Sequence, residues 1–373
     1  MPNFDIVKEV KPKQTFRVAS VMGKFDLQSY HIVERFTGNI DIAENWQIGL
    51  IVGKSGTGKT TIAKQLFPES YITSYEYNAE TVLDDMPKNC SVDQITSAFN
   101  SVGFSSPPSW LKPYAVLSNG QKMRVDLARA ILEDQNLFVF DEFTSVVDRN
   151  VAQIGSFAMQ KAIRKTSKKF IAVTCHFDVK DWLLPDWIFD TDTMTFQSLE
   201  GQKKNRPEIK FEIRKSKSWN ETKFIWRIFS KYHYLNLNIN QNVKAFYLYV
   251  NYQIAGFFAY MTFPHPKIKN VKKISRIVIL PDYQGIGLSK IMTELICDNL
   301  ITDGFKIYGQ TSHPAVINYR KNSKKWCLKK YGRGSKSSKA NSTLKSKIKT
   351  ENTGKNAKNI SINKITTSWE YIG

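Results

Sequence analysis

Short apolar runs alternate with helical stretches in the first half of the chain. The runs at Ile48–Val52, Asn136–Phe140 and Phe170–Thr174 are rich in β-branched and aromatic residues, and helical patterns occupy Thr61–Phe67 and Lys122–Leu132. Continuous apolar strands between helices are typical of a parallel sheet that is covered on both faces. The pattern therefore predicts an α/β domain.

The second half has a different order of elements. They are, along the chain, a helix over Glu221–Tyr232, hairpin strands over Ala245–Val250 and Ile254–Met261, a strand over Ile274–Leu280, a helix over Lys290–Leu300 and a strand over Phe305–Tyr308. A hairpin followed by one strand, turn and helix unit is an α+β arrangement. We therefore expect a second domain of a different class.

The division between the domains is predicted from a polar segment. The chain has 373 residues, about twice the usual length of one domain, and Leu199–Arg206 is a polar stretch that ends before Pro207. We predict one domain over residues 1–205 and a second over residues 206–373. Residues 333–359 are rich in Lys, Ser, Asn and Thr and contain too few apolar side chains for a core, which predicts a flexible insertion.

Positive charge is concentrated in the second half. Residues 1–200 carry 21 Lys and Arg against 24 Asp and Glu, whereas residues 201–373 carry 33 against 9. Such a field attracts polyanions, and nucleic acid is the commonest of them. We predict double-stranded DNA as the partner; the alternative is a solvated basic tail without a specific ligand.

The sequence contains no signal for export or for a membrane span. The longest candidate, Ala245–Phe263, is interrupted by Asn251, Gln253 and Gly256. The four cysteines lie far apart and form no CxxC pair, which favours a reducing compartment. We expect a cytoplasmic protein that has no membrane partner.

A glycine-rich octapeptide follows the first apolar strand. Residues 53–60 read GKSGTGKT, which fits the GxxxxGK[ST] pattern of a phosphate-binding loop at every position. Backbone N–H groups of such a loop surround phosphate oxygens, Lys59 reaches the β- and γ-phosphates, and the Thr60 hydroxyl binds magnesium. The residues predicted to bind ATP are Gly53, Ser55, Gly56, Gly58, Lys59, Thr60 and Thr61.

Two acidic residues follow a second buried strand. Leu137–Phe140 leads directly into Asp141 and Glu142. One carboxylate at this position can complete the magnesium shell with Thr60, and the next can polarise the attacking water. We predict Thr60 and Asp141 as metal ligands and Glu142 as the catalytic residue.

With these motifs, the first half resembles the ABC-type ATPases. Residues 117–121 read LSNGQ where the family signature is LSGGQ, and His176 follows the strand Phe170–Thr174 as the switch histidine does. The resemblance implies that Glu142 is the general base and that His176 contacts the γ-phosphate. It also implies a homodimer through the ATPase domains, in which Ser118 and Gly120 reach the nucleotide of the opposite subunit. The short segment between Lys59 and Ser118 favours the members that act on nucleic acid.

A second glycine loop occurs in the other half. Residues 281–289 read PDYQGIGLS and connect a predicted strand to a predicted helix, which creates another anion cradle at a helix N-terminus. The stretch resembles the acyl-CoA loop of GNAT acetyltransferases, with Gln284 and Gly287 matching and Ser289 departing. The predicted donor is acetyl-CoA or a related acyl donor, held by Gln284, Gly285, Gly287 and Ser289. A tight turn without a ligand is the alternative.

Further stretches resemble one branch of that fold, the phage Mom proteins, which modify adenine in DNA. These stretches are Tyr232–Leu235, the PDYQGIG loop, Thr311–Ala315 with Arg320–Trp326, and Ser368–Tyr371. The resemblance implies addition of a carbamoylmethyl group to the exocyclic amine of adenine. Transfer to an amine needs proton acceptors and donors, and His233 and Tyr319 are the predicted catalytic pair, with Tyr232, Tyr234 and His313 as further candidates. Core or base-stacking aromatics are the alternative role of the tyrosines.

Together, these features predict an α/β P-loop NTPase (ABC-type) domain followed by an α+β GNAT-like acyltransferase domain. The predicted function is an ATP-dependent enzyme that modifies the adenine amine in DNA. One alternative is an acetyl-CoA-dependent N-acetyltransferase that acts on RNA or protein. Another is a non-catalytic ABC ATPase clamp on DNA.

Overall fold

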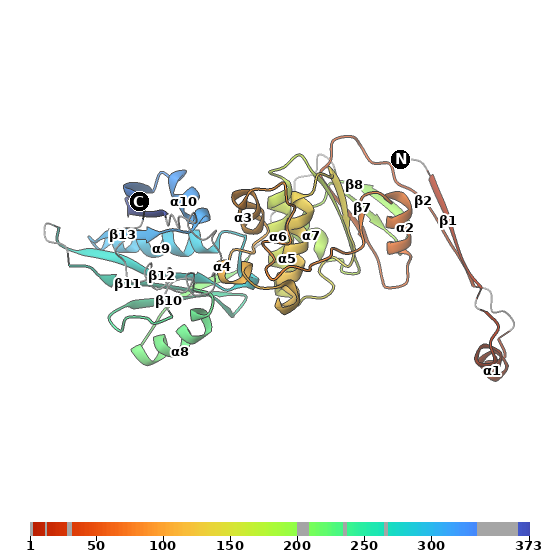
Figure 1. Ribbon diagram of the computed structural model, residues 1–373, viewed down its shortest axis with the longest axis horizontal. Coiled ribbons are helices and arrows are strands. Elements are labelled where there is room, and N and C mark those ends of the chain that lie inside the picture. The colour runs from red at the N-terminus through yellow and green to blue at the C-terminus, as the bar shows by residue number, and fades with distance from the viewer. Residues whose placement is uncertain are drawn as a thin grey trace, which may run out of the picture. The chain divides into compact units, whose positions relative to one another are not determined.

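The computed structural model describes residues 3–11, 13–27, 32–199, 209–233, 237–264, 268–333 and 365–373. The chain divides into two compact units (Figure 1). The first contains Met1–Ile209 together with Pro281–Ile286, and the second contains Lys210–Leu280 and Gly287–Gly373. The predicted boundary near residue 205 and most of the predicted insertion over 333–359 lie outside the described residues. The assignment of Pro281–Ile286 to the first unit departs from the division predicted from sequence.

The first unit is built on a six-stranded sheet. Its strands are, in spatial order, β4 (Tyr71–Ile72), β5 (Leu137–Phe140), β6 (Lys169–Thr174), β3 (Ile48–Val52), β7 (Trp187–Asp190) and β8 (Thr195–Ser198). All neighbours pair in parallel except β7 and β8. The parallel sheet predicted from the apolar runs is therefore present.

Helices bury both faces of this sheet. Side chains of a strand alternate between its faces, and accordingly Leu50 and Val52 enter one hydrophobic core while Ile51 enters another. The helices of the unit are α2 (Lys59–Leu66), α3 (Val92–Ser101), α4 (Pro107–Trp110), α5 (Asn119–Leu132), α6 (Arg149–Ile163) and α7 (Val179–Leu183), with the 3₁₀ turn η1 (Tyr114–Val116). Burial on both sides explains why β3 and β5 contain no polar side chain.

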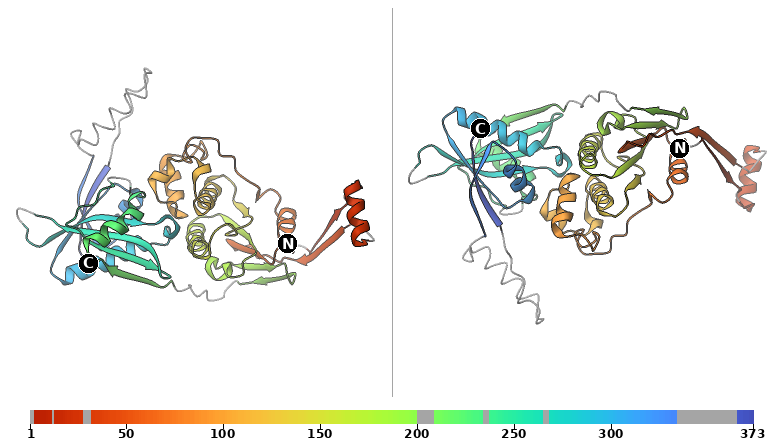
Figure 2. Two further views of the ribbon diagram at one scale, coloured as in Figure 1. Left: turned by 90° about the horizontal axis from the view of Figure 1, so that it is seen from below. Right: turned by 90° about the horizontal axis from the view of Figure 1, so that it is seen from above.

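An antiparallel hairpin precedes the P-loop strand and was not predicted from the sequence. It is formed by β1 (Asn3–Val10) and β2 (Ile32–Asn39), and the segment between them contains α1 (Phe16–Phe25). Phe4 and Phe36 of the hairpin pack into the core that also contains Ile51, whereas α1 buries none of its residues. Figure 2 shows α1 at the end of the hairpin that lies away from α2.

The second unit contains a seven-stranded sheet. Its strands are, in spatial order, β14 (Trp326–Arg333), β15 (Ile365–Tyr371), β13 (Lys306–Thr311), β12 (Val271–Ile279), β11 (Gln253–Thr262), β10 (Lys244–Val250) and β9 (Phe211–Lys215). Only β12 and β13 pair in parallel, and their ladder joins Val271–Lys273 to Lys306–Tyr308. The remainder of β12 continues beyond that ladder toward the second glycine loop.

In the part of this half that the structure describes, three helices and a 3₁₀ turn occur between the strands along the chain. They are α8 (Trp219–Ser230), η2 (Pro281–Tyr283), α9 (Leu288–Thr302) and α10 (Pro314–Lys321), of which η2 falls in the first unit. Trp226 and Phe229 of α8 pack against Tyr247 and Phe257 in the core of the second unit. The strands and helices predicted for this half are present, with ends that differ by a few residues.

Candidate functional site

The predicted P-loop joins the carboxyl end of β3 to α2. Gly56 and Gly58 have φ values of 86° and 85°, in the left-handed region that glycine adopts without strain. Gly58 is also the N-cap of α2, so this helix begins without a side-chain cap from its N-cap residue. A Cβ at Gly58 would lie 2.4 Å from Phe36 Cε1. This loop thus requires glycine both for its conformation and for its packing, and it presents a helix N-terminus to an anion.

Lys59 is held close to the loop that precedes it. Its side chain is only 8% exposed, and Nζ donates a hydrogen bond of 2.5 Å to the carbonyl oxygen of Lys54. Ser55 is exposed and Thr61 is half-buried. An ammonium group folded over the loop lies where a phosphate-binding lysine is needed.

Two residues after β7 contact the P-loop from its other side, and no sequence motif indicates them. The hydroxyl oxygens of Thr57 and Thr191 lie 2.5 Å apart, and the backbone N–H of Lys54 donates to Asp192 Oδ1 at 2.7 Å. A Cβ at Gly53 would lie 2.2 Å from Thr191 Oγ1. These residues belong to no nucleotide-binding pattern, so only the pairing of β7 with β3 reveals their role.

The Asp141 carboxylate, at the end of β5, accepts three hydrogen bonds. The Thr60 hydroxyl donates to Oδ2 at 2.7 Å, the Tyr71 hydroxyl donates to the same oxygen, and the N–H of Glu142 donates to Oδ1 at 2.8 Å. A hydroxyl beside a carboxylate is the hard oxygen donor set that Mg²⁺ prefers, so Thr60 and Asp141 fit the predicted metal. Burial raises the pKa of the Tyr71 phenol, and Asp141 raises it further, so this phenol keeps its proton.

Glu142 and His176 follow neighbouring strands. The chain after β5 turns with Glu142 at a φ of 51°, and the Glu142 residue is exposed. His176 follows β6, is half-buried, and its backbone N–H donates to Thr174 Oγ1 at 3.2 Å. Because β3, β6 and β5 are adjacent and parallel, the P-loop, Glu142 and His176 all leave the same edge of the sheet.

The signature segment forms the start of α5. Ser118 caps this helix through a capping box with Gln121: its hydroxyl accepts from the Gln121 N–H, and its own N–H donates to the Gln121 side chain. Ser118 is exposed, as a contact with another subunit requires. Gly120 is buried, and a Cβ there would lie 3.0 Å from Val151 of α6.

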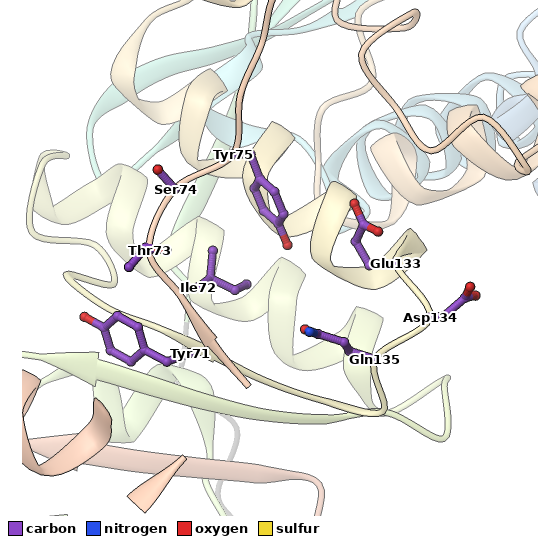
Figure 3. A pocket seen from close by; sticks show the side chains of 8 residues that line it. All are labelled: Tyr71, Ile72, Thr73, Ser74, Tyr75, Glu133, Asp134 and Gln135. Atoms are coloured by element: carbon purple, nitrogen blue, oxygen red, sulfur yellow. The ribbon is translucent and has the colours of Figure 1, made fainter. Parts of the chain in front are cut away.

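A cavity of about 510 Å³ lies between the segment that begins with β4 and the turn before β5. Figure 3 shows its lining, which is Tyr71, Ile72, Thr73, Ser74 and Tyr75 from β4 and the segment after it, with Glu133, Asp134 and Gln135 from the turn before β5. It contains none of the predicted nucleotide-binding residues. Through Tyr71 alone it touches the Asp141 site.

The second glycine loop leads from β12 into α9. Gly285 and Gly287 have φ values of 94° and 95°, and Gly287 caps α9 without a side-chain hydrogen bond to its first turn. The space at the Cβ position of Gly287 is open, and Ser289 in the first turn is half-buried. Glycines with left-handed geometry at an open helix N-terminus fit the phosphates of an acyl-CoA donor. The Gln284 side chain, however, accepts a hydrogen bond of 2.8 Å from the N–H of Ser105.

The predicted transferase residues each have their own surroundings. The Tyr319 hydroxyl donates to Glu294 Oε1 and accepts from the Trp326 indole at 3.2 Å. Burial, with the Glu294 carboxylate, raises the pKa of Tyr319, so the phenol stays protonated. His233 lies edge-on to Trp226 with ring centroids 5.7 Å apart.

The remaining transferase candidates are His313, Tyr232 and Tyr234. His313 caps α10, and its N–H donates to Thr311 Oγ1 at 3.1 Å. Tyr232 follows α8 and is half-buried, while Tyr234 lies outside the described residues. Across the described part of the chain, no three His, Cys, Asp or Glu side chains gather as a metal site, and no helix there is long and apolar enough to span a bilayer.

Comparison with known proteins bears on the fold. A profile of the ABC transporter family matches residues 71–145, which include the signature and Asp141–Glu142. The helix-covered parallel sheet of the first unit and the mixed sheet of the second confirm the α/β and α+β classes predicted from the sequence, and the profile match agrees with an ABC-type segment in the first unit.

Individual solved structures resemble parts of this chain. The dimeric bacterial ABC transporter cassette MJ0796 is 15% identical over 45% of this chain and 93% of its own, with a TM-score of 0.36. The ribosomal-protein-S18-alanine N-acetyltransferase from Escherichia coli is 14% identical over 43% of this chain and 93% of its own, with a TM-score of 0.31. A GNAT-family protein from Desulfovibrio desulfuricans is 8% identical over 44% and 100%, with a TM-score of 0.32.

Proposed function

We propose that the chain is an ATP-dependent enzyme whose first unit hydrolyses ATP and whose second unit transfers a small group to an amine in DNA. The observation that carries the ATPase assignment is the hydrogen bond of 2.7 Å between Thr60 and Asp141, directly beside the exposed Glu142. Hydroxyl, carboxylate and base come from two neighbouring loops, which is the arrangement that phosphoryl transfer to water requires.

Each of these residues has a distinct part in hydrolysis. ATP with Mg²⁺ supplies the phosphoanhydride and the charge that shields its oxygens. Lys59 binds phosphate oxygens, Thr60 and Asp141 hold the metal, and Glu142 accepts a proton from the attacking water. His176 contacts the γ-phosphate. Ser118 of a second copy completes the site, so the active form is a head-to-tail homodimer.

The second unit is proposed to bind its donor at the N-terminus of α9. Gly285, Gly287 and Ser289 offer backbone to the donor phosphates. The amine nitrogen attacks the donor carbon, the bond to the leaving group breaks, and Tyr319 protonates that leaving group while His233 takes the amine proton. The Tyr319 phenol carries its proton at neutral pH, as a general acid must, but its raised pKa makes it a weaker acid than a free phenol.

DNA is the proposed substrate because the basic charge is concentrated in the half that carries the transferase. Residues 201–373 hold 33 basic against 9 acidic side chains. The resemblance of the Tyr232–Leu235 and Ser368–Tyr371 stretches to the Mom proteins favours the adenine amine as the acceptor. The positive charge supports binding to DNA phosphates, and the resemblance supports adenine as the modified nucleobase.

Nucleoside mass spectrometry of DNA from cells that express the gene tests the proposal. The expected result is a new adenosine mass that is absent when Lys59 is replaced by Ala. Unmodified DNA together with acetylated RNA or protein would instead support an N-acetyltransferase. No new mass in any of the three would favour the non-catalytic clamp.

DNA binding by the full chain gives an independent test. Counterion release predicts a log–log slope of about −0.9 for each phosphate contact, so affinity for duplex should fall steeply as salt rises. Fluorescence anisotropy with labelled duplex measures this slope. Binding that does not respond to salt would contradict the DNA assignment.

A further inference from the structure

A buried arginine of the signature helix contacts the second glycine loop. Arg124 lies on α5, is only 1% exposed, and donates to three carbonyl oxygens. Nη1 reaches Gly103 at 2.8 Å and Gln284 at 3.2 Å, and Nη2 reaches Asp282 at 3.0 Å. These contacts lie inside the first compact unit, which includes Pro281–Ile286. One guanidinium therefore joins the helix that begins at the signature to the loop that precedes α9.

Other residues of the first unit pack closely against this loop. The Gln284 side chain accepts from the Ser105 N–H at 2.8 Å. A Cβ at Gly285 would lie 2.8 Å from the Cα of Gly103 and 2.8 Å from the Cβ of Ala158 on α6. Backbone thus meets backbone at two glycines, and no side chain larger than hydrogen fits there.

The loop also approaches the first turns of α5 and α6. A Cβ at Gly120, within the signature, would lie 3.5 Å from Asp282 Oδ1. Asp148 caps α6, and its charge contributes to a raised pKa of Asp282, for which burial is the main cause. The first turns of the signature helix α5 and of α6 therefore bound the same short loop.

We propose that Arg124 is a positioning residue that couples the nucleotide state of the ATPase to the conformation of the loop Pro281–Gly287. The proposal rests on the proposed function in two respects, the engagement of a nucleotide by Ser118 and the binding of donor phosphates near Gly287. A planar guanidinium with several fixed donors holds carbonyl groups in one geometry, and few other side chains can do so. A shift of α5 when Ser118 engages a nucleotide must then move Asp282 and Gln284, or break their hydrogen bonds.

The consequence for the second unit follows from chain connectivity. Ile286 is the last residue of the loop in the first unit, and Gly287 is the N-cap of α9. Any displacement of the loop backbone is passed to the N–H groups of that helix N-terminus. ATP binding would therefore change the affinity for a donor anion, and the donor would change the affinity for ATP by the same factor.

Hydrogen exchange of the full chain tests the coupling without a donor. Mass spectrometry follows peptides that cover Asp282–Lys290, with and without Mg²⁺ and a non-hydrolysable ATP analogue. In the parent, nucleotide should change the exchange rate of these amides by roughly fivefold or more, the lower end of usual allosteric coupling. In Arg124→Met, the same amides should exchange rapidly and should no longer respond.

Two further variants keep the test decisive. Arg124→Lys retains the buried charge but not the planar fork, so it should fold more readily and show a weaker response. Arg129→Met is the matched control, because Arg129 is on the same helix but contacts Glu133 and the carbonyl of Glu76; its loop should respond as the parent's does.

A parent loop that ignores nucleotide, or Arg124 variants that respond fully, would overturn the proposal. If only the transfer to DNA is wrong, the loop would still respond to nucleotide, but nucleosides from the DNA would be unmodified.

Discussion

Two glycine loops of this chain have nearly the same backbone and very different surroundings. Gly58 and Gly287 each cap a helix with φ near the left-handed region, at 85° and 95°, and neither helix has a side-chain cap. The first loop continues into Lys59 and Thr60, with Asp141 in hydrogen-bond contact. The second continues into Leu288 and Ser289. Only the first combines an anion site with the charges that phosphate cleavage needs.

The difference teaches that a helix N-terminus supplies binding, whereas the residues beside it supply chemistry. Backbone N–H groups can hold a phosphate at either loop. Beside the first loop, the proposed metal ligands Thr60 and Asp141 and the proposed base Glu142 would complete a hydrolytic centre. Beside the second, Arg124 and Ser105 hold the loop in place. We therefore expect ATP to be hydrolysed at the first loop, and the phosphates of a donor to be bound but not cleaved at the second.

The largest expected effect is on the catalytic carboxylate of the first loop's site. Glu142→Gln should lower ATP hydrolysis by about 10²- to 10⁴-fold, because it removes the base, and should leave ATP binding intact because Asp141 and Thr60 remain. Steady-state hydrolysis and nucleotide binding measured together check this. The variant should also accumulate as an ATP-bound dimer in sedimentation. A parental rate of hydrolysis would remove Glu142 from the role of base.

The second prediction concerns Lys59→Ala. Loss of the phosphate contact should reduce modification of duplex DNA by about tenfold or more, since exposing a paired base costs a few kcal/mol that ATP binding is expected to offset. Single-stranded DNA should be affected less, because its bases are already accessible. Matched duplex and single-stranded substrates, with circular dichroism to confirm folding, provide the measurement. If parent and variant modify duplex DNA equally, ATP binding does not help to expose the base.

The smallest effect compares the two capping glycines directly. Gly287→Ala meets open space and should cost only the strain of a left-handed residue, about 1–2 kcal/mol. Gly58→Ala adds a clash with Phe36 and should cost more. Exchange of amides in α2 and α9 during urea titration reports each helix separately. The comparison fails if Gly287→Ala destabilises α9 as strongly as Gly58→Ala destabilises α2.

Local signals in the sequence were sufficient for much of the fold and for the position of the first glycine loop. Continuous apolar runs predicted β3, β5 and β6, and the GKSGTGKT spacing placed Lys59 and Thr60 at the start of a helix. Thr191, Asp192 and Tyr71 were missed because they act through pairing and packing between strands, which leave no local pattern. The hairpin β1–β2 was missed because only some of its residues, such as Phe4 and Phe36, are buried.

Arg124 was passed over for a related reason. On a helix with a basic, polar sequence it reads as one more surface charge, and only its 1% exposure shows otherwise. The loop at Pro281–Ile286 was recognised as a glycine turn, but its packing partners Gly103 and Ala158 are distant in the chain. The catalytic roles of Tyr319 and His233 stay predictions, since their contacts with Glu294 and Trp226 fit structural roles as well.

The meeting of Gly103 and Gly285 has a practical consequence for dissecting the protein. Cutting the chain near residue 205 leaves the amino-terminal fragment without Pro281–Ile286, so the surface around Gly103, Arg124 and Ala158 loses its cover. The carboxyl-terminal fragment then carries a loop shaped for a neighbour that it no longer has. Chimeras that exchange only the second half should therefore include matched residues at Gly103 and Arg124, and separately expressed halves are expected to be less soluble than the whole chain.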